Sequence, residues 1–115
     1  MPDWAIKIVK QSHGKIVFVP VQHNAKPGDP LTAQQYDNVY WSNTTDKTHT
    51  ITVLNDTNSV TLPAIPAGES SIYYNITQPK GQPSSWIITY SCTKHPTEKG
   101  VINASVIPVT TIPPS

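Results

Sequence analysis

The fold of this chain is decided by residues 90–102, YSCTKHPTEKGVI, which join two runs typical of β-strands. This segment holds Cys92, the only cysteine among 115 residues, and His95 follows it after a gap of two residues. A second imidazole, His49, lies far upstream in another run typical of a strand. A thiolate and imidazoles are donors for soft and borderline metal ions, so these side chains are candidate metal ligands on a β-rich framework.

These donor types favour copper, because two imidazoles and one thiolate form the trigonal set of electron-transfer copper sites. Other interpretations remain open. One alternative is that Cys92 is an ordinary buried thiol, since free cysteine is among the most buried residue types. Another is that His49 is a hydrogen-bonded core histidine. His49, Cys92, His95 and Glu98 also match zinc chemistry, although structural zinc sites usually carry more cysteines.

Length and composition indicate one small domain with no nucleic-acid function. Charged residues make up 13% of the 115, the net charge is +1, and no charge run predicts binding to nucleic acid or to an anionic membrane. Twelve prolines and five glycines leave no room for long helices. No apolar stretch reaches the roughly 20 residues that a membrane-spanning helix needs.

Short apolar runs rich in β-branched and aromatic residues recur along the chain, separated by turn residues, and they predict an all-β Greek-key sandwich or barrel of about eight strands. The domain is predicted to span residues 1–107, and residues 108–115 to form an extended tail rich in Pro and Thr. A short helical turn is expected at Gln34 or Gln35, and Trp4, Trp41 and Trp86 on the inner faces. The predicted strands are 4–9, 15–21, 38–42, 49–54, 59–62, 70–76, 86–90 and 100–107.

The chain is expected to be exported, to a periplasmic, pseudoperiplasmic or extracellular location. A lone cysteine forms no disulfide within the chain, and in an oxidising compartment it needs burial or a metal. The N-terminus shows no signal peptide, so this interpretation assumes a leader that is absent here. Four glycosylation sequons, at Asn43, Asn55, Asn75 and Asn103, give weak support, since about two are expected by chance at this content of Thr and Ser.

Three segments together resemble the cupredoxins, a family of small copper proteins. Residues 38–43 followed by 49–52 resemble the segment that carries the family's first ligand. Residues 66–74 resemble the turn and strand before the metal loop, and residues 90–102 the short metal loop of plastocyanin-like and amicyanin-like members. The resemblance implies a cupredoxin fold and makes His49, Cys92 and His95 the equatorial copper ligands.

The resemblance places Glu98 where the family usually has an axial methionine. Either its carboxylate binds the metal, or Lys94 or Lys99 draws it outward and the axial position stays open or holds water. Around the sulfur, the backbone N–H of Thr50 is expected to donate to Cys92. Many short-loop relatives have proline two residues after the cysteine; here Lys94 keeps an N–H that is a second candidate donor.

The function implied is one-electron transfer by one copper ion that changes between Cu(I) and Cu(II), in a carrier rather than an enzyme. Redox partner proteins are expected to dock transiently near His95. The alternative is a copper-dependent protein that binds or oxidises nitric oxide or nitrite at an open axial site. A further alternative is a copper-free structural β-sandwich. Lys80, Lys94 and Lys99 are expected to cluster near the metal and to attract an acidic partner.

Overall fold

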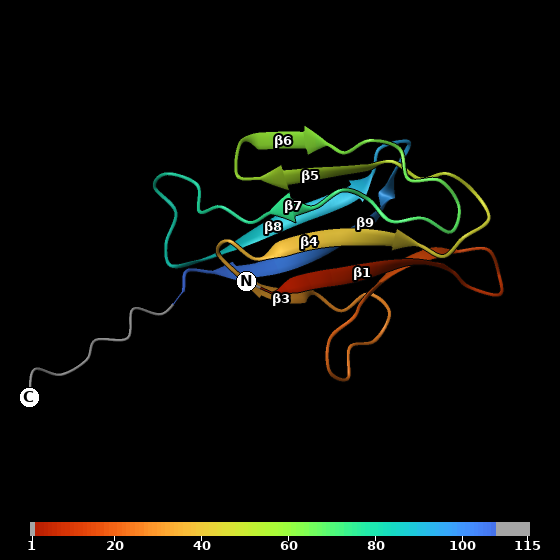
Figure 1. The fold of residues 1–115 in the computed structure, drawn as a ribbon, viewed down its shortest axis with the longest axis horizontal. Coiled ribbons are helices and arrows are strands. Elements are labelled where there is room, and N and C mark those ends of the chain that lie inside the picture. The colour runs from red at the N-terminus through yellow and green to blue at the C-terminus, as the bar shows by residue number, and fades with distance from the viewer. Residues whose placement is uncertain (1, 108–115) are drawn as a thin grey trace, which may run out of the picture.

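Two β-sheets face each other in the computed structural model, which describes residues 2–107 (Figure 1). The predicted tail, residues 108–115, lies outside the described residues. One sheet has the strand order β2-β1-β4-β7 and the other β3-β9-β8-β5-β6. The strands are β1 (Asp3–Lys10), β2 (Ile16–Pro20), β3 (Leu31–Gln34), β4 (Asn38–Asn43), β5 (Ile51–Asn55), β6 (Asn58–Thr61), β7 (Tyr74–Asn75), β8 (Ser85–Cys92) and β9 (His95–Ser105).

Both sheets are mixed, because β1 pairs with β4 and β3 pairs with β9 in parallel, and every other pair of strands is antiparallel. The predicted all-β sandwich is therefore confirmed, with nine strands among residues 2–107. Within the same residues no helix is long and apolar enough to cross a membrane.

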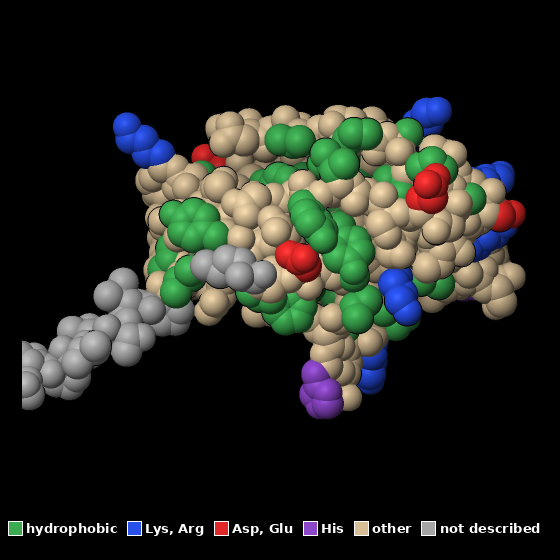
Figure 2. All heavy atoms as spheres, viewed as in Figure 1, with side chains coloured by type: hydrophobic (Ala, Val, Ile, Leu, Met, Phe, Trp, Pro, Cys, Tyr) green, Lys and Arg blue, Asp and Glu red, His purple; other side chains and the backbone are tan. Residues whose placement is uncertain are grey.

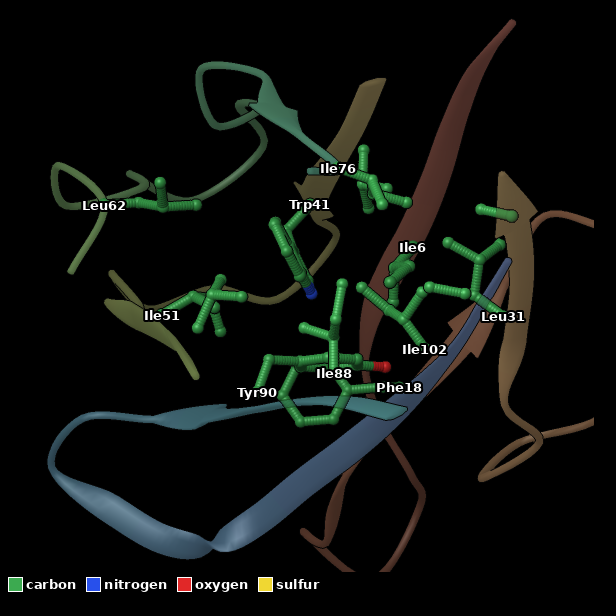
Figure 3. Close-up of a cluster of buried hydrophobic side chains, with 14 of the residues drawn as sticks. Ile6, Phe18, Leu31, Trp41, Ile51, Leu62, Ile76, Ile88, Tyr90 and Ile102 are labelled. Carbon is green, nitrogen blue, oxygen red and sulfur yellow. The ribbon is translucent and has the colours of Figure 1, made fainter. Parts of the chain in front are cut away.

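The core lies between the sheets and follows from the two-residue alternation of the central strands. In β4 and β8 every second side chain is buried, and Trp41, Ile88 and Tyr90 meet in the middle of the sandwich (Figure 3). Trp41 and Trp86 are buried as predicted. Trp4 is half-buried: it packs against the core, and its indole N–H donates to the buried Asp37 at 2.9 Å.

Several predicted elements differ from the structure. The helical turn expected at Gln34 or Gln35 is wrong: residues 31–34 form β3, whose Leu31 and Ala33 alternate into the core beside β9. The long strand predicted at 70–76 shrinks to β7, because residues 70–73 run along β4 with only one isolated bridge, Ser42 to Ser70. β9 begins at His95, earlier than predicted, since a tight two-residue turn joins it directly to β8.

Candidate metal centre

His49 lies two residues before β5, in the segment that crosses from one sheet to the other. Its backbone makes a reciprocal pair of hydrogen bonds with Ile65: the His49 N–H donates at 3.0 Å and the Ile65 N–H donates back at 2.7 Å. This isolated bridge holds the imidazole at one end of the sandwich without a full strand around it.

Asn43, the last residue of β4, fixes the loop that carries His49. Its buried amide N–H₂ donates to the carbonyls of Lys47 at 2.7 Å and Ile65 at 2.9 Å. Its side-chain oxygen accepts from the backbone N–H of Thr45 at 3.0 Å and from the Thr45 hydroxyl at 2.7 Å. The sequence places Asn43 at the end of a predicted strand segment and in a sequon, and does not predict this role. The available signal was an Asn followed by polar residues directly after an apolar strand, a pattern typical of a side-chain-stabilised turn.

Cys92 ends β8 and is buried, with 2% of its surface exposed. Thr93 and Lys94 form a tight turn that brings His95 opposite Cys92 in the ladder. The turn is tied to the residue after His49, because the Thr93 N–H donates to the Thr50 carbonyl at 2.8 Å. A backbone hydrogen bond therefore joins the segment that carries the Cys92 sulfur to the segment that carries the His49 imidazole.

A break in the β8–β9 register positions Glu98. Ser91 pairs with Lys99, whereas the next residue, Cys92, pairs with His95, so residues 96–98 bulge out of the ladder. Bulges re-aim side chains, and here the bulge turns Glu98 back toward the sulfur instead of along the outer face. Glu98 is half-buried, not drawn out into solvent by Lys94 or Lys99.

Three of the predicted side chains converge. The donor atoms of His49, Cys92 and Glu98 all lie within 4.8 Å of one another. The Nδ1 atom of His49 is 3.3 Å from the Cys92 sulfur. His95 is exposed and outside this group of three, but it lines both hollows that border the site. The first hollow, of about 210 Å³, also reaches His49 and Glu98, and the second reaches Cys92, Thr50 and Lys94.

Burial and the neighbouring Glu98 charge keep the Cys92 thiol protonated, and burial favours neutral His49, in the absence of a cation. Burial first, and then a hydrogen bond and the negative charge of Glu98, raise the pKa of the Cys92 thiol to about 12. Burial lowers the pKa of His49, against the opposing effect of the Glu98 charge, which favours the neutral imidazole that a metal requires.

The donor set fits a soft or borderline metal ion. The buried Nε2 of His49 and Oε1 of Glu98 have no hydrogen-bond partner among the described residues. Unsatisfied buried polar atoms are costly, and a cation that displaces the thiol proton would compensate the charge of both anionic donors. Thiolate, imidazole and carboxylate are ligands that copper and zinc both accept. Donation to the sulfur from Thr50 and Lys94 stays a prediction.

Comparison with known proteins yields a match in fold. No family model matches the chain, and no curated protein matches it. Solved structures of amicyanin match the chain in fold. A reduced Cu(I) form of a proline-to-glycine mutant at pH 4 has a TM-score of 0.60 at 15% identity, over 88% of this chain and 80% of that one. A reduced tryptophan-to-tyrosine mutant and an oxidised methionine-to-lysine mutant give the same TM-score and coverage, at 16% and 17% identity.

The chain has the cupredoxin fold. The resemblance to the cupredoxins that the sequence indicated is therefore confirmed for the fold. In this cupredoxin fold the candidate donors come together at one end of the sandwich, where the β8–β9 turn meets the loop between β4 and β5 (Figure 1).

Proposed function

We propose that this chain is a mononuclear copper protein that carries single electrons. The observation that carries the proposal is the convergence of the Cys92 sulfur, the His49 Nδ1 and the Glu98 carboxylate at the end of a cupredoxin sandwich. Bound copper supplies the Cu(I)/Cu(II) couple that such a carrier needs. His95, which lies opposite Cys92 in the β8–β9 ladder, is the proposed third equatorial ligand.

The chain's own contribution is rigidity. His49 is held by the Ile65 bridge and by Asn43, and Cys92 by its strand and the tie from Thr93 to Thr50. Donors fixed in this way move little when the charge at the site changes, so little reorganisation accompanies electron transfer. The exposed edge of His95 is the proposed point of electron entry and exit, reached by a transient redox partner.

Glu98 is the proposed fourth donor, in preference to water. The buried and unpartnered Oε1 supports direct ligation, and a hard anionic oxygen favours the oxidised ion. Replacing Glu98 with Gln is expected to raise the reduction potential and strengthen the visible thiolate band. A variant with an unchanged potential and spectrum would exclude Glu98 as a ligand.

The test of the main proposal is to add copper to the full chain and record visible and electron paramagnetic resonance spectra. An intense thiolate-to-copper band is expected, which Cys92→Ser abolishes and His13→Ala, a change in the β1–β2 turn, leaves intact. A chain that binds one zinc ion but gives no thiolate band with copper would identify a zinc site. Export from the cytoplasm is part of the proposal and is tested by fractionating the source cells.

A second candidate function rests on the hollow of about 210 Å³ that reaches His49, His95 and Glu98. It has room for a small nitrogen oxide beside the donor group, which would make the chain a nitric oxide binding or oxidising protein. Stopped-flow mixing of the oxidised copper form with nitric oxide tests this. Retention of the colour together with no formation of nitrite would exclude the second candidate.

A further inference from the structure

The charged side chains are unevenly distributed between the two ends of the sandwich. We use the term donor end for residues 10–16, 44–50, 66–69 and 91–99, which surround the group of three donors. This end has more lysines than carboxylates. Its lysines are Lys10, Lys15, Lys47, Lys94 and Lys99, and its carboxylates are Asp46, Glu69 and Glu98. Since Glu98 is turned into the donor group, only two of the carboxylates lie on the outer surface.

Three exposed lysines line the two hollows that His95 also lines. Lys10 and Lys47 line the hollow that His95 shares with Glu98, and Lys47 and Lys94 line the hollow that His95 shares with Cys92. One exposed carboxylate, Asp46, lines the first hollow, and none lines the second. The proposed point of electron entry is therefore bordered mainly by positive charge.

The opposite end has the reverse balance. Two exposed carboxylates lie there: Asp3 begins β1, and Asp56 lies in the β5–β6 turn, whereas Asp37, before β4, is buried. Lys80 is in the loop between β7 and β8 at this same end, because Gln82 in that loop donates to Asp56. The predicted cluster of Lys80 with Lys94 and Lys99 is thus wrong, since Lys80 lies at the far end from the other two. In Figure 2, lysines gather at the right-hand end together with carboxylates, and a lysine lies near a carboxylate at the left-hand end.

We propose that the donor end docks onto an acidic surface of a partner protein, with Lys10, Lys47 and Lys94 around the contact. Only one part of this proposal rests on the proposed function, namely that the partner is a redox protein. Opposite charges on two surfaces raise the rate of encounter and select the orientation more than they raise affinity, which suits a transient contact. Five lysines with two outward carboxylates among them are too few for the phosphate array that nucleic-acid binding uses.

The first experiment measures charge at the site with small redox reagents. The Cu(I) form is oxidised by anionic ferricyanide and by cationic tris-phenanthroline cobalt(III), from about 10 mM to about 300 mM ionic strength. The ferricyanide rate is expected to fall by roughly threefold or more as salt screens the lysines, and the cobalt rate to rise or stay level. A ferricyanide rate that does not depend on salt would overturn the proposal.

Charge variants locate the effect. Lys10→Glu, Lys47→Glu and Lys94→Glu combined should reverse both salt dependences, and the corresponding Gln variants should abolish them. Lys80→Glu at the opposite end is the matched control and should change neither. All lysines in the set are exposed, and a melting curve checks that each variant is folded. If Lys80→Glu has as large an effect as the triple variant, the site of docking is wrong.

The second experiment does not depend on copper. The metal-free full chain is titrated with a hexaglutamate peptide while its amide resonances are followed. Shifts are expected in residues 44–49 and 93–95 and not in residues 78–84. If the peptide shifts the resonances of residues 44–49 and 93–95 but the chain binds no copper, docking of the donor end to acidic surfaces is supported. The proposed electron transfer then fails. Equal binding of a short DNA strand or of phosphatidylserine vesicles, or no shifts at the donor end, would overturn the proposal.

Discussion

At the scale of single residues, Tyr90 and Gly100 depend on each other. They pair directly across β8 and β9, and the Tyr90 ring lies where a Cβ at position 100 would be. The ring also contacts Phe18 and Trp41 edge-on, with centroids 4.9 and 5.2 Å away. We expect Gly100→Ala to displace the ring and lower the free energy of unfolding by about 1–3 kcal/mol. Urea unfolding measures this, with Asn103→Ala as an exposed control on the same strand. If Gly100→Ala and Asn103→Ala lower the free energy of unfolding equally, the Tyr90 ring moves aside without cost.

The Tyr90 hydroxyl is buried without a hydrogen-bond partner among residues 2–107, and burial raises the pKa of this phenol. An unsatisfied buried hydroxyl costs free energy, so its removal should not destabilise the protein. We expect Tyr90→Phe to leave the free energy of unfolding unchanged or to raise it slightly. Destabilisation by more than about 1 kcal/mol would mean that the hydroxyl binds an ordered water.

The Cys92 thiol makes stability depend on pH in the metal-free chain. Its pKa is about 12 in the folded state and about 8.5 in an unfolded chain. Because the folded state holds the proton more tightly, this contribution is fully present below about pH 8.5 and is lost as pH rises above it. Urea unfolding between about pH 7 and about pH 9.5 should show the decline, which Cys92→Ala removes. The native thiol should also resist iodoacetamide at about pH 9, and fast alkylation there would contradict the raised pKa.

At the scale of elements, the loop from β4 to β5 depends on Asn43. Asn43→Ala leaves the carbonyls of Lys47 and Ile65 without this donor and the backbone N–H of Thr45 without its acceptor. We expect the variant to lose about 2–3 kcal/mol of folding free energy and to bind metal more weakly, because His49 is no longer held. Asn103→Ala, at an exposed sequon on β9, is the control. Full metal affinity in Asn43→Ala would show that the Ile65 bridge alone positions His49.

Also at this scale, the sequence predicts some elements and not others, for physical reasons. The alternation in β4 and β8 is regular enough to place Trp41 and Tyr90 in the core. β3 is missed because its four residues, LTAQ, gain their strand conformation from pairing with β9 rather than from propensity. His49 and Cys92 are recognisable by donor type. The inward direction of Glu98 depends on the bulge at 96–98, a register break that residue pattern does not specify.

At the scale of the whole molecule, the candidate site links segments that separate on unfolding. His49 and Cys92 are 43 residues apart in sequence, so the donor group exists only in the folded state. A metal ion that binds only the folded state stabilises it by an amount that grows with ligand concentration, about 4 kcal/mol at a thousand times Kd. We therefore expect Cu(I) or Zn²⁺ to raise the Tm progressively with concentration, and a chelator to reverse the shift. Cys92→Ser should remove most of it, whereas Lys80→Gln at the opposite end should not. A Tm that stays constant while metal binds stoichiometrically would place the bound ion elsewhere, for instance at exposed histidines that the unfolded chain also offers.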